Sequence, residues 1–291
     1  MLPDGAIDLS SLHQHLGAVA RAPGLSGLLV NGHAGENFTL TRAEQRTVLD
    51  AARAAMPAPA RIVAGINAEA SAAAAAIAED AAKAGADAIL VFPPFSWALS
   101  QDVNVIVRHH ALVAEACTLP MFLYQAPVAA AQLAYREDTL AALLALPTVA
   151  GIKEGSWETA AYEANRRLVR RIRPDVVVMA SGDEHLLTCF VLGSEGSLVS
   201  LAALAPSLIV ALEAAVRDGN LAAARDAHAI LYPLARAIYG TRPSGRATAR
   251  LKACLHMMGQ ISHASCRAPM AELPANELTM LRTALAVARL I

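Results

Sequence analysis

The sequence predicts an α/β protein, a (β/α)8 TIM barrel with its first strand short or missing, followed by three C-terminal helices. Three observations predict this fold. Short apolar runs typical of buried parallel strands alternate with segments of helical period. The alternation continues from residue 27 to residue 217 and then gives way to helical periodicity alone. A chain of 291 residues has room for one barrel and additional helices.

Strands are expected where an apolar run ends at glycine, proline or polar residues. Seven runs meet this description: residues 27–31, 61–66, 88–92, 121–124, 149–153, 175–180 and 196–201. Helices are expected around them at residues 8–20, 41–55, 71–84, 101–117, 137–146, 157–172, 185–192 and 206–217. Residues 1–5 are too few and too polar to supply a good strand before the first helix. Either the start is truncated relative to a full barrel, or the first strand is vestigial.

Three further helices are predicted at residues 221–239, 245–258 and 276–290, with Pro233 kinking the first. Because no strand is expected among them, we divide the chain into a catalytic barrel, residues 1–219, and a helical extension, residues 220–291. Such an extension would serve as a cap or as a subunit contact.

Composition narrows the class of partner. The formal net charge is −1, so neither nucleic acid nor an anionic membrane surface is expected to bind. The first residues lack the pattern of a secretory signal, and the four cysteines have no paired or ligand-like spacing. We therefore expect a cytoplasmic protein without a metal or a cofactor, whose partner is a small molecule.

The most informative stretch is residues 149–156, where an apolar strand ends on Lys153. In a barrel, a residue at that position lies near the carboxyl ends of the strands, where barrel enzymes build their active sites. Burial disfavours the ammonium, so part of the amine is neutral and can attack a ketone to form a Schiff base. A solvated lysine at a strand end is the alternative.

Other strand ends supply candidate partners for Lys153. Tyr124 ends the preceding strand, and a phenol beside a Schiff-base lysine can transfer protons to and from the carbinolamine. The glycine turn at residues 32–36 exposes backbone N–H groups before a helix, a suitable place for a substrate carboxylate. Asp183 and Glu184 follow a later strand, and capping of the next helix and catalysis are both open for them.

These strand ends, in this order, resemble the dihydrodipicolinate synthase and N-acetylneuraminate lyase family of class I aldolases. The motifs that carry the resemblance are Gly32-x-x-Gly35-Glu36, Tyr124-x-x-Pro127, Gly151-Ile152-Lys153-Glu154 and Ser181-Gly182-Asp183, with the helical tail. The resemblance implies Lys153 as the Schiff-base residue, Tyr124 as the proton relay, and no cofactor beyond the covalent lysine adduct. It also implies a homotetramer or homodimer.

The resemblance also places the carboxylate of pyruvate or another 2-oxo acid in the turn after Gly32, and a main-chain carbonyl near Leu198 in the pocket. The residues expected to bind substrate are Gly32, His33, Ala34, Gly35, Phe95, Gly182, Asp183 and Leu198.

Three departures from the family pattern concern the substrate. The pair His33-Ala34 stands where dihydrodipicolinate synthases carry two threonines, so the carboxylate-binding hydroxyl and the usual hydroxyl relay are missing. The second relay tyrosine falls among residues 95–97, and the arginine expected after Tyr-x-x-Pro is replaced by residues 128–130. Phe95 and Trp97 are available to contact an apolar or aromatic group.

We therefore expect a Schiff-base lyase, namely a catabolic aldolase, hydratase-aldolase or dehydratase acting on a 2-oxo acid. One alternative is an altered paralogue that binds a 2-oxo acid without turnover. Another is a 4-hydroxy-tetrahydrodipicolinate synthase, and a phosphate-binding barrel enzyme ranks last because Glu195 would repel phosphate.

Overall fold

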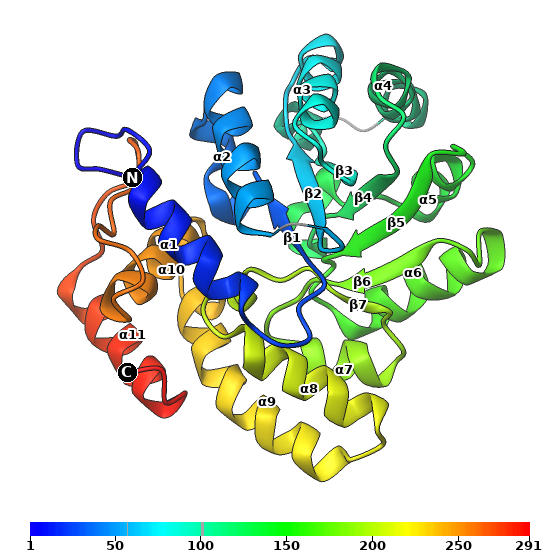
Figure 1. Cartoon of the computed structure of the whole chain (residues 1–291). Coiled ribbons are helices and arrows are strands. Elements are labelled where there is room, and N and C mark those ends of the chain that lie inside the picture. The colour runs from blue at the N-terminus through cyan, green and yellow to red at the C-terminus, as the bar shows by residue number, and fades with distance from the viewer. Residues whose placement is uncertain (57, 100–101) are drawn as a thin grey trace.

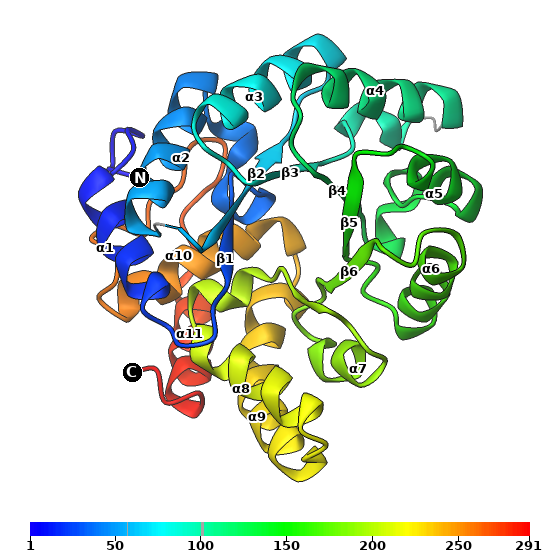
Figure 2. The same ribbon diagram turned by 45° about the vertical axis from the view of Figure 1, so that its right-hand side comes forward.

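The computed structural model describes residues 1–56, 58–99 and 102–291. Its core is one sheet of seven strands in the order β1 to β7, with every neighbouring pair parallel. The strands are β1 (Gly27–Val30), β2 (Arg61–Ile66), β3 (Ala88–Val91), β4 (Met121–Gln125), β5 (Val149–Glu154), β6 (Val177–Ala180) and β7 (Gly196–Ser197). Figure 2 shows the strands curling in an arc with helices outside it.

Helices alternate with the strands along the chain. They are α1 (Leu9–Ala20), α2 (Arg42–Ala55), α3 (Ser71–Lys83), α4 (Val103–Ala116), α5 (Glu137–Leu144), α6 (Thr159–Ile172), α7 (Leu186–Val191) and α8 (Pro206–Arg217). Residues 1–8 contain no strand. The predicted TIM barrel lacking its first strand is therefore confirmed, and Figure 1 shows α2 to α6 fanned around the outside of the sheet.

Element boundaries differ from the prediction mainly near the end of the barrel. β6 begins two residues later than expected, and β7 has two residues before the chain turns into a 3-10 helix at Ser200–Ala203. Only the first two residues of the apolar run 196–201 are therefore strand. Leu198 and Leu201 are still packed in the interior, but the backbone has left the sheet. The predicted helix start at Gln101 lies outside the described residues.

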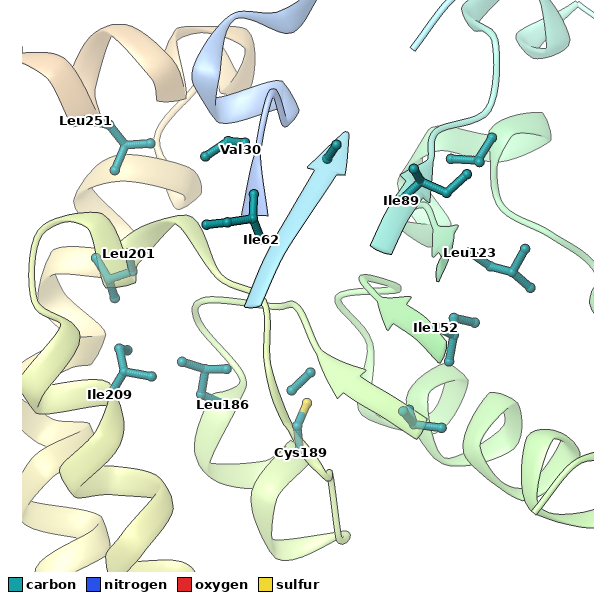
Figure 3. Close-up of a cluster of buried hydrophobic side chains, with 14 of the residues drawn as sticks. Val30, Ile62, Ile89, Leu123, Ile152, Leu186, Cys189, Leu201, Ile209 and Leu251 are labelled. Carbon is teal, nitrogen blue, oxygen red and sulfur yellow. The ribbon is translucent and has the colours of Figure 1, made fainter. Parts of the chain in front are cut away.

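The strands bury two separate layers of side chains, because successive residues point to opposite faces. The outer layer packs against the helices, and Figure 3 shows Ile62, Ile89, Leu123 and Ile152 in this cluster. The inner layer is a smaller cluster of Val63, Ala88, Leu90 and Phe92, with Leu29, Phe122, Tyr124 and Leu198 packed against it. Along each strand, the side chains therefore alternate between the helices outside the sheet and the barrel interior.

The C-terminal extension contains three α-helices, as predicted: α9 (Leu221–Ala235), α10 (Ala247–Met257) and α11 (Ala275–Val287). Pro233 lies inside α9, and a π-helical turn at Arg236–Gly240 follows it directly. In Figures 1 and 2, α10 lies beside α1 and α9 beside α8. The division of the chain at residue 219 stays a prediction.

Gly151 shapes the barrel interior below Lys153. It pairs with Phe122 in the β4–β5 register, and a Cβ added at Gly151 would lie 2.3 Å from the Phe122 ring. The missing side chain therefore lets the Phe122 ring occupy the centre of the barrel, one layer beneath the lysine.

Gly151→Ala should lower the free energy of unfolding by about 1–3 kcal/mol, because the new methyl group would overlap the ring of Phe122. Urea unfolding measures the change. Gly245→Ala is the matched control: a Cβ there meets no atom within 4 Å. An equal change in both variants would contradict the proposed packing role of Gly151.

Candidate active site

Lys153 and Tyr124 lie side by side at the carboxyl ends of β5 and β4. The two residues are direct partners in the parallel register, so their side chains project from the same face. The Nζ atom of Lys153 lies 5.6 Å from the centroid of the Tyr124 ring. Because Tyr124 belongs to the inner cluster, this shared face is the barrel interior.

The environment of Lys153 favours the neutral amine. Burial lowers the pKa of its ammonium group to about 8, and the opposing charge of Asp183 limits the fall. A pKa of about 8 leaves roughly a tenth of the amine neutral at pH 7, against about 0.1% or less for an ordinary lysine. The site therefore supplies a nucleophile under neutral conditions.

Tyr124 carries its proton throughout the neutral range. Burial raises the pKa of its phenol to about 12, and the nearby carboxylates of Asp183 and Glu154 add to the effect. The hydroxyl group is therefore a proton donor beside the amine.

His33 begins a 3-10 turn, His33–Gly35, that follows β1 and faces Tyr124. Its imidazole stacks on Phe92 with ring centroids 4.0 Å apart, and it meets the edge of Tyr124 at 5.6 Å. Burial, helped by the charge of Lys153, lowers the pKa of His33 to about 4, so the ring is neutral at pH 7. Within the described residues, its buried Nε2 atom has no hydrogen-bond partner.

Phe95 lies at the outer edge of the same aromatic group. Its ring centroid is 5.6 Å from that of His33, and the residue is 45% exposed. Glu69 holds the turn, since its carboxylate accepts hydrogen bonds from the backbone N–H groups of Phe95 at 2.8 Å and Ser96 at 3.0 Å. Nothing in the sequence marks Glu69, because its partners lie 26 and 27 residues further along the chain.

Trp97, which was expected beside Phe95 at the pocket, is not part of this aromatic group. Its ring packs on His109 and His110, with centroids 5.3 and 6.2 Å away, in the layer between the strands and the helices. His110 is fixed by contacts of its Nδ1 with the carbonyl of Ile106 and of its Nε2 with the hydroxyl of Tyr135. These histidines are thus packed and hydrogen-bonded side chains of the helical layer.

Asp183 and Glu184 have different partners. Asp183 is 5% exposed, and its carboxylate accepts a hydrogen bond from the backbone N–H of Leu201 at 2.7 Å. Burial raises the pKa of Asp183 to about 6, and Lys153 opposes the shift. Glu184 forms an ion pair with Arg236 of the extension at 2.8 Å. Neither carboxylate caps α7, which has no side-chain cap.

The remaining predicted site residues lie around this centre. Leu198 packs on the inner cluster and donates its backbone N–H to the carbonyl of Ala180 at 2.9 Å. Gly182 is buried beside Asp183, and its carbonyl accepts the N–H of His185. Ala34 packs partly on the outer core. Gly32 and Gly35 bound the turn, where a Cβ at Gly35 would meet open space.

The turn is tied to the C-terminal extension through Glu36. This carboxylate is 3% exposed, pairs with Lys252 of α10, and accepts the backbone N–H of Arg267 at 3.1 Å. Lys252 also donates to the carbonyl of Ser265 at 2.9 Å. The position of His33 therefore depends on residues more than 200 positions away.

Tyr239 is a second residue that the sequence did not indicate, since it lies at the end of the helix predicted at residues 221–239 and carries no motif. It lies in the π-helical turn, and its ring meets the Trp157 ring at 5.3 Å. Its hydroxyl forms a hydrogen bond with Ser200, and burial, together with the negative charge of Asp183, raises the pKa of the tyrosine. The side chain of Tyr239 thus reaches the ends of β5, β6 and β7.

Across residues 1–56, 58–99 and 102–291, no three His, Cys, Asp or Glu side chains are grouped to hold a metal ion. None of the helices described is both long enough and apolar enough to span a membrane.

Together, the fold and the site define a parallel barrel with a buried lysine of lowered pKa at the end of one strand and a protonated phenol at the end of the next. The sequence profile of the Dihydrodipicolinate synthetase family matches residues 1–288. The chain therefore belongs to this family.

Two relatives carry the name of a synthase of this family. A 4-hydroxy-tetrahydrodipicolinate synthase of Anaeromyxobacter sp. strain K is 29% identical over 98% of this chain and 92% of its own. One of Neisseria meningitidis serogroup C is 32% identical over 72% of this chain and 70% of its own.

Among structures, YagE, a family member from E. coli K12 solved in complex with pyruvate, has a TM-score of 0.91. Its sequence is 23% identical, and the match covers 100% of this chain and 96% of the YagE chain. A monomeric dihydrodipicolinate synthase variant matches with a TM-score of 0.89 and 23% identity, over 100% of this chain and 94% of its own.

Asp183→Asn should lower the pKa of Lys153 below about 8, because the carboxylate is the charge that stabilises the ammonium. An asparagine oxygen can still accept the N–H of Leu201. The pH dependence of Lys153 acylation, followed by peptide mass spectrometry, measures the pKa. Glu184→Gln is the control, and an unchanged or higher pKa in Asp183→Asn would refute the pairing.

Proposed function

We propose that this protein is a Schiff-base lyase that acts on pyruvate or another 2-oxo acid through an iminium on Lys153. The observation that carries the proposal is the placement of a lysine with a lowered pKa directly opposite a protonated phenol in the barrel interior. Membership of the Dihydrodipicolinate synthetase family supports it.

The chemistry follows from the two groups. The neutral amine of Lys153 adds to the C2 carbonyl carbon, and the resulting carbinolamine loses its hydroxyl as water once the oxygen receives a proton. The phenol of Tyr124 supplies that proton. The iminium then withdraws electrons from C3, which loses a proton to give an enamine. The enamine can form or break a C–C bond, or expel a leaving group.

We place the substrate carboxylate at the turn that begins with Gly32. The first N–H groups of a helical turn have no partner within the turn, and the unpaired Nε2 of His33 offers one further hydrogen bond. Because His33 is neutral at pH 7, it would bind the carboxylate as a hydrogen-bond donor and not as a charge.

The part of the substrate beyond C3 would meet an apolar surface. Phe95 and Val128, on the turns after β3 and β4, are 45% and 40% exposed. Exposed aromatic and aliphatic side chains beside a polar centre favour an apolar or aromatic fragment. We therefore favour a catabolic aldolase, hydratase-aldolase or dehydratase.

A 4-hydroxy-tetrahydrodipicolinate synthase is the second candidate, because the relatives at 29–32% identity carry that name. Two features oppose it: His33-Ala34 replaces the two threonines, and residues 128–130 contain no arginine. Turnover of pyruvate with aspartate semialdehyde would decide in its favour.

We further propose that the protein is a cytoplasmic homo-oligomer, a tetramer or a dimer, with the barrel and the extension as its two units. The match to a structure described as a monomeric variant makes the subunit number worth measuring by light scattering.

Reduction with borohydride in the presence of pyruvate should add the mass of the reduced adduct to Lys153, and Lys153→Ala should abolish it. Tyr124→Phe should form the adduct at least about 100-fold more slowly, because it lacks the phenolic proton. Peptide mass spectrometry reads both results. If pyruvate and larger 2-oxo acids all fail to form an adduct in the wild type, the proposed function is wrong.

A further inference from the structure

The exposed ring of Phe95 is the outer end of a column of three stacked rings. The His33 ring lies 4.0 Å from the Phe92 ring at an interplanar angle of 27°, and 5.6 Å from the Phe95 ring at 29°. Phe92 is 1% exposed and Phe95 is 45% exposed, so the column runs from the barrel interior to the surface. Its outer end therefore presents an aromatic side chain on which a further planar ring can pack.

The column is continuous with the candidate active site. The Tyr124 ring lies 4.9 Å from the Phe92 ring and 5.6 Å from the His33 ring. The Nζ atom of Lys153 lies 5.6 Å from the centroid of Tyr124. An apolar group beyond C3 of a 2-oxo acid bound to Lys153 would therefore have the rings of this column within reach.

The turn that carries Phe95 is held from outside by Glu69. The first N–H groups of a helical turn have no partner within it, and the N-cap residue of the 3-10 turn Phe95–Ala98 is Pro94, whose side chain cannot accept a hydrogen bond. Glu69 supplies both partners: one carboxylate oxygen accepts the N–H of Phe95 at 2.8 Å, and the other accepts that of Ser96 at 3.0 Å. Because hydrogen bonds to a carboxylate are stronger than those between neutral groups, Glu69 fixes the backbone of Phe95.

Glu69 serves this turn and not the helix next to it in the chain. The N-cap residue of α3 is Ala70, one position further on, and the Glu69 carboxylate reaches across to the turn after β3. On the other side of the turn, the Trp97 ring packs on His109 with centroids 5.3 Å apart. The turn is thus anchored at both ends, and Phe95 is held in one place before any substrate arrives.

We propose that Glu69 sets the specificity of this site by holding Phe95 where an aryl group of the substrate packs on it. The proposal rests on the proposed function and names its substrate class, a 2-oxo acid that carries an aryl group beyond C3. Phe95 contacts that group, and Glu69 is a positioning residue that acts through Phe95.

The test compares two 2-oxo acids that differ only in the ring, 4-phenyl-2-oxobutanoate and 2-oxobutanoate. The full chain is reduced with borohydride at a series of concentrations of each acid, and peptide mass spectrometry of the Lys153 adduct gives the half-saturating concentration. We expect this concentration to be at least about tenfold lower for the phenyl compound in the wild type, because the ring adds apolar burial and aromatic contact with Phe95.

Glu69→Gln keeps the length of the side chain but offers only one oxygen to the two N–H groups. We expect it to lower the preference for the phenyl compound at least about threefold, and Phe95→Ala to lower it by at least as much. In the double variant, the loss should equal that of Phe95→Ala alone, because Glu69 acts through this ring. Phe95→Tyr, which keeps the ring, should retain the preference.

Two matched controls lie outside the column. Glu79→Gln makes the same substitution at a carboxylate of α3 that pairs with Lys83 at 2.8 Å. Leu99→Ala shortens an apolar side chain that is 88% exposed and directly follows the turn. Both variants should keep the wild-type preference.

The outcomes separate the proposals. Adducts with both acids but no preference for the phenyl compound in the wild type would overturn the aryl site, while the Schiff-base function stands. An unchanged preference in Glu69→Gln, or a Glu69→Gln loss that is equally large in the Phe95→Ala background, would overturn the positioning role of Glu69. No adduct in the wild type with either acid or with pyruvate would overturn the function and the aryl site together.

Discussion

Desolvation of the Lys153 amine is the interaction on which the rest of the site depends. The barrel interior removes water from the ammonium, and Asp183 returns only part of the lost stabilisation. The same enclosure keeps Tyr124 protonated and His33 neutral. One physical cause thus sets three groups in the states that imine chemistry needs: a nucleophile, a proton donor and an uncharged hydrogen-bonding ring.

The strands and the central pair could be predicted from the sequence because parallel strands impose a strict order. Carboxyl ends of neighbouring strands meet at one edge, so Tyr124 and Lys153 had to be adjacent once both runs were recognised as strands. The motif resemblance added the family, which the comparisons confirm. The run at residues 196–201 misled because apolar content alone does not distinguish a short strand from a packed turn.

Contacts across long stretches of chain could not be predicted. Glu69 holds the turn that carries Phe95, and nothing in either segment marks the other. Tyr239 reaches Ser200 only because a π-helical turn follows Pro233, which changes the direction of the side chains after it. Periodicity assumes a regular helix, so a residue in an irregular turn is assigned to the wrong face.

The ion pair of Glu36 with Lys252 bears on how such barrels can be altered. In the sequence, the glycine turn at residues 32–36 is a short motif of five residues. Its buried carboxylate, however, is completed by α10 and by the backbone at Arg267. A change that removed the Lys252 ammonium would leave the Glu36 carboxylate buried without its counterion, so the tail helps to hold the turn that carries His33 in place.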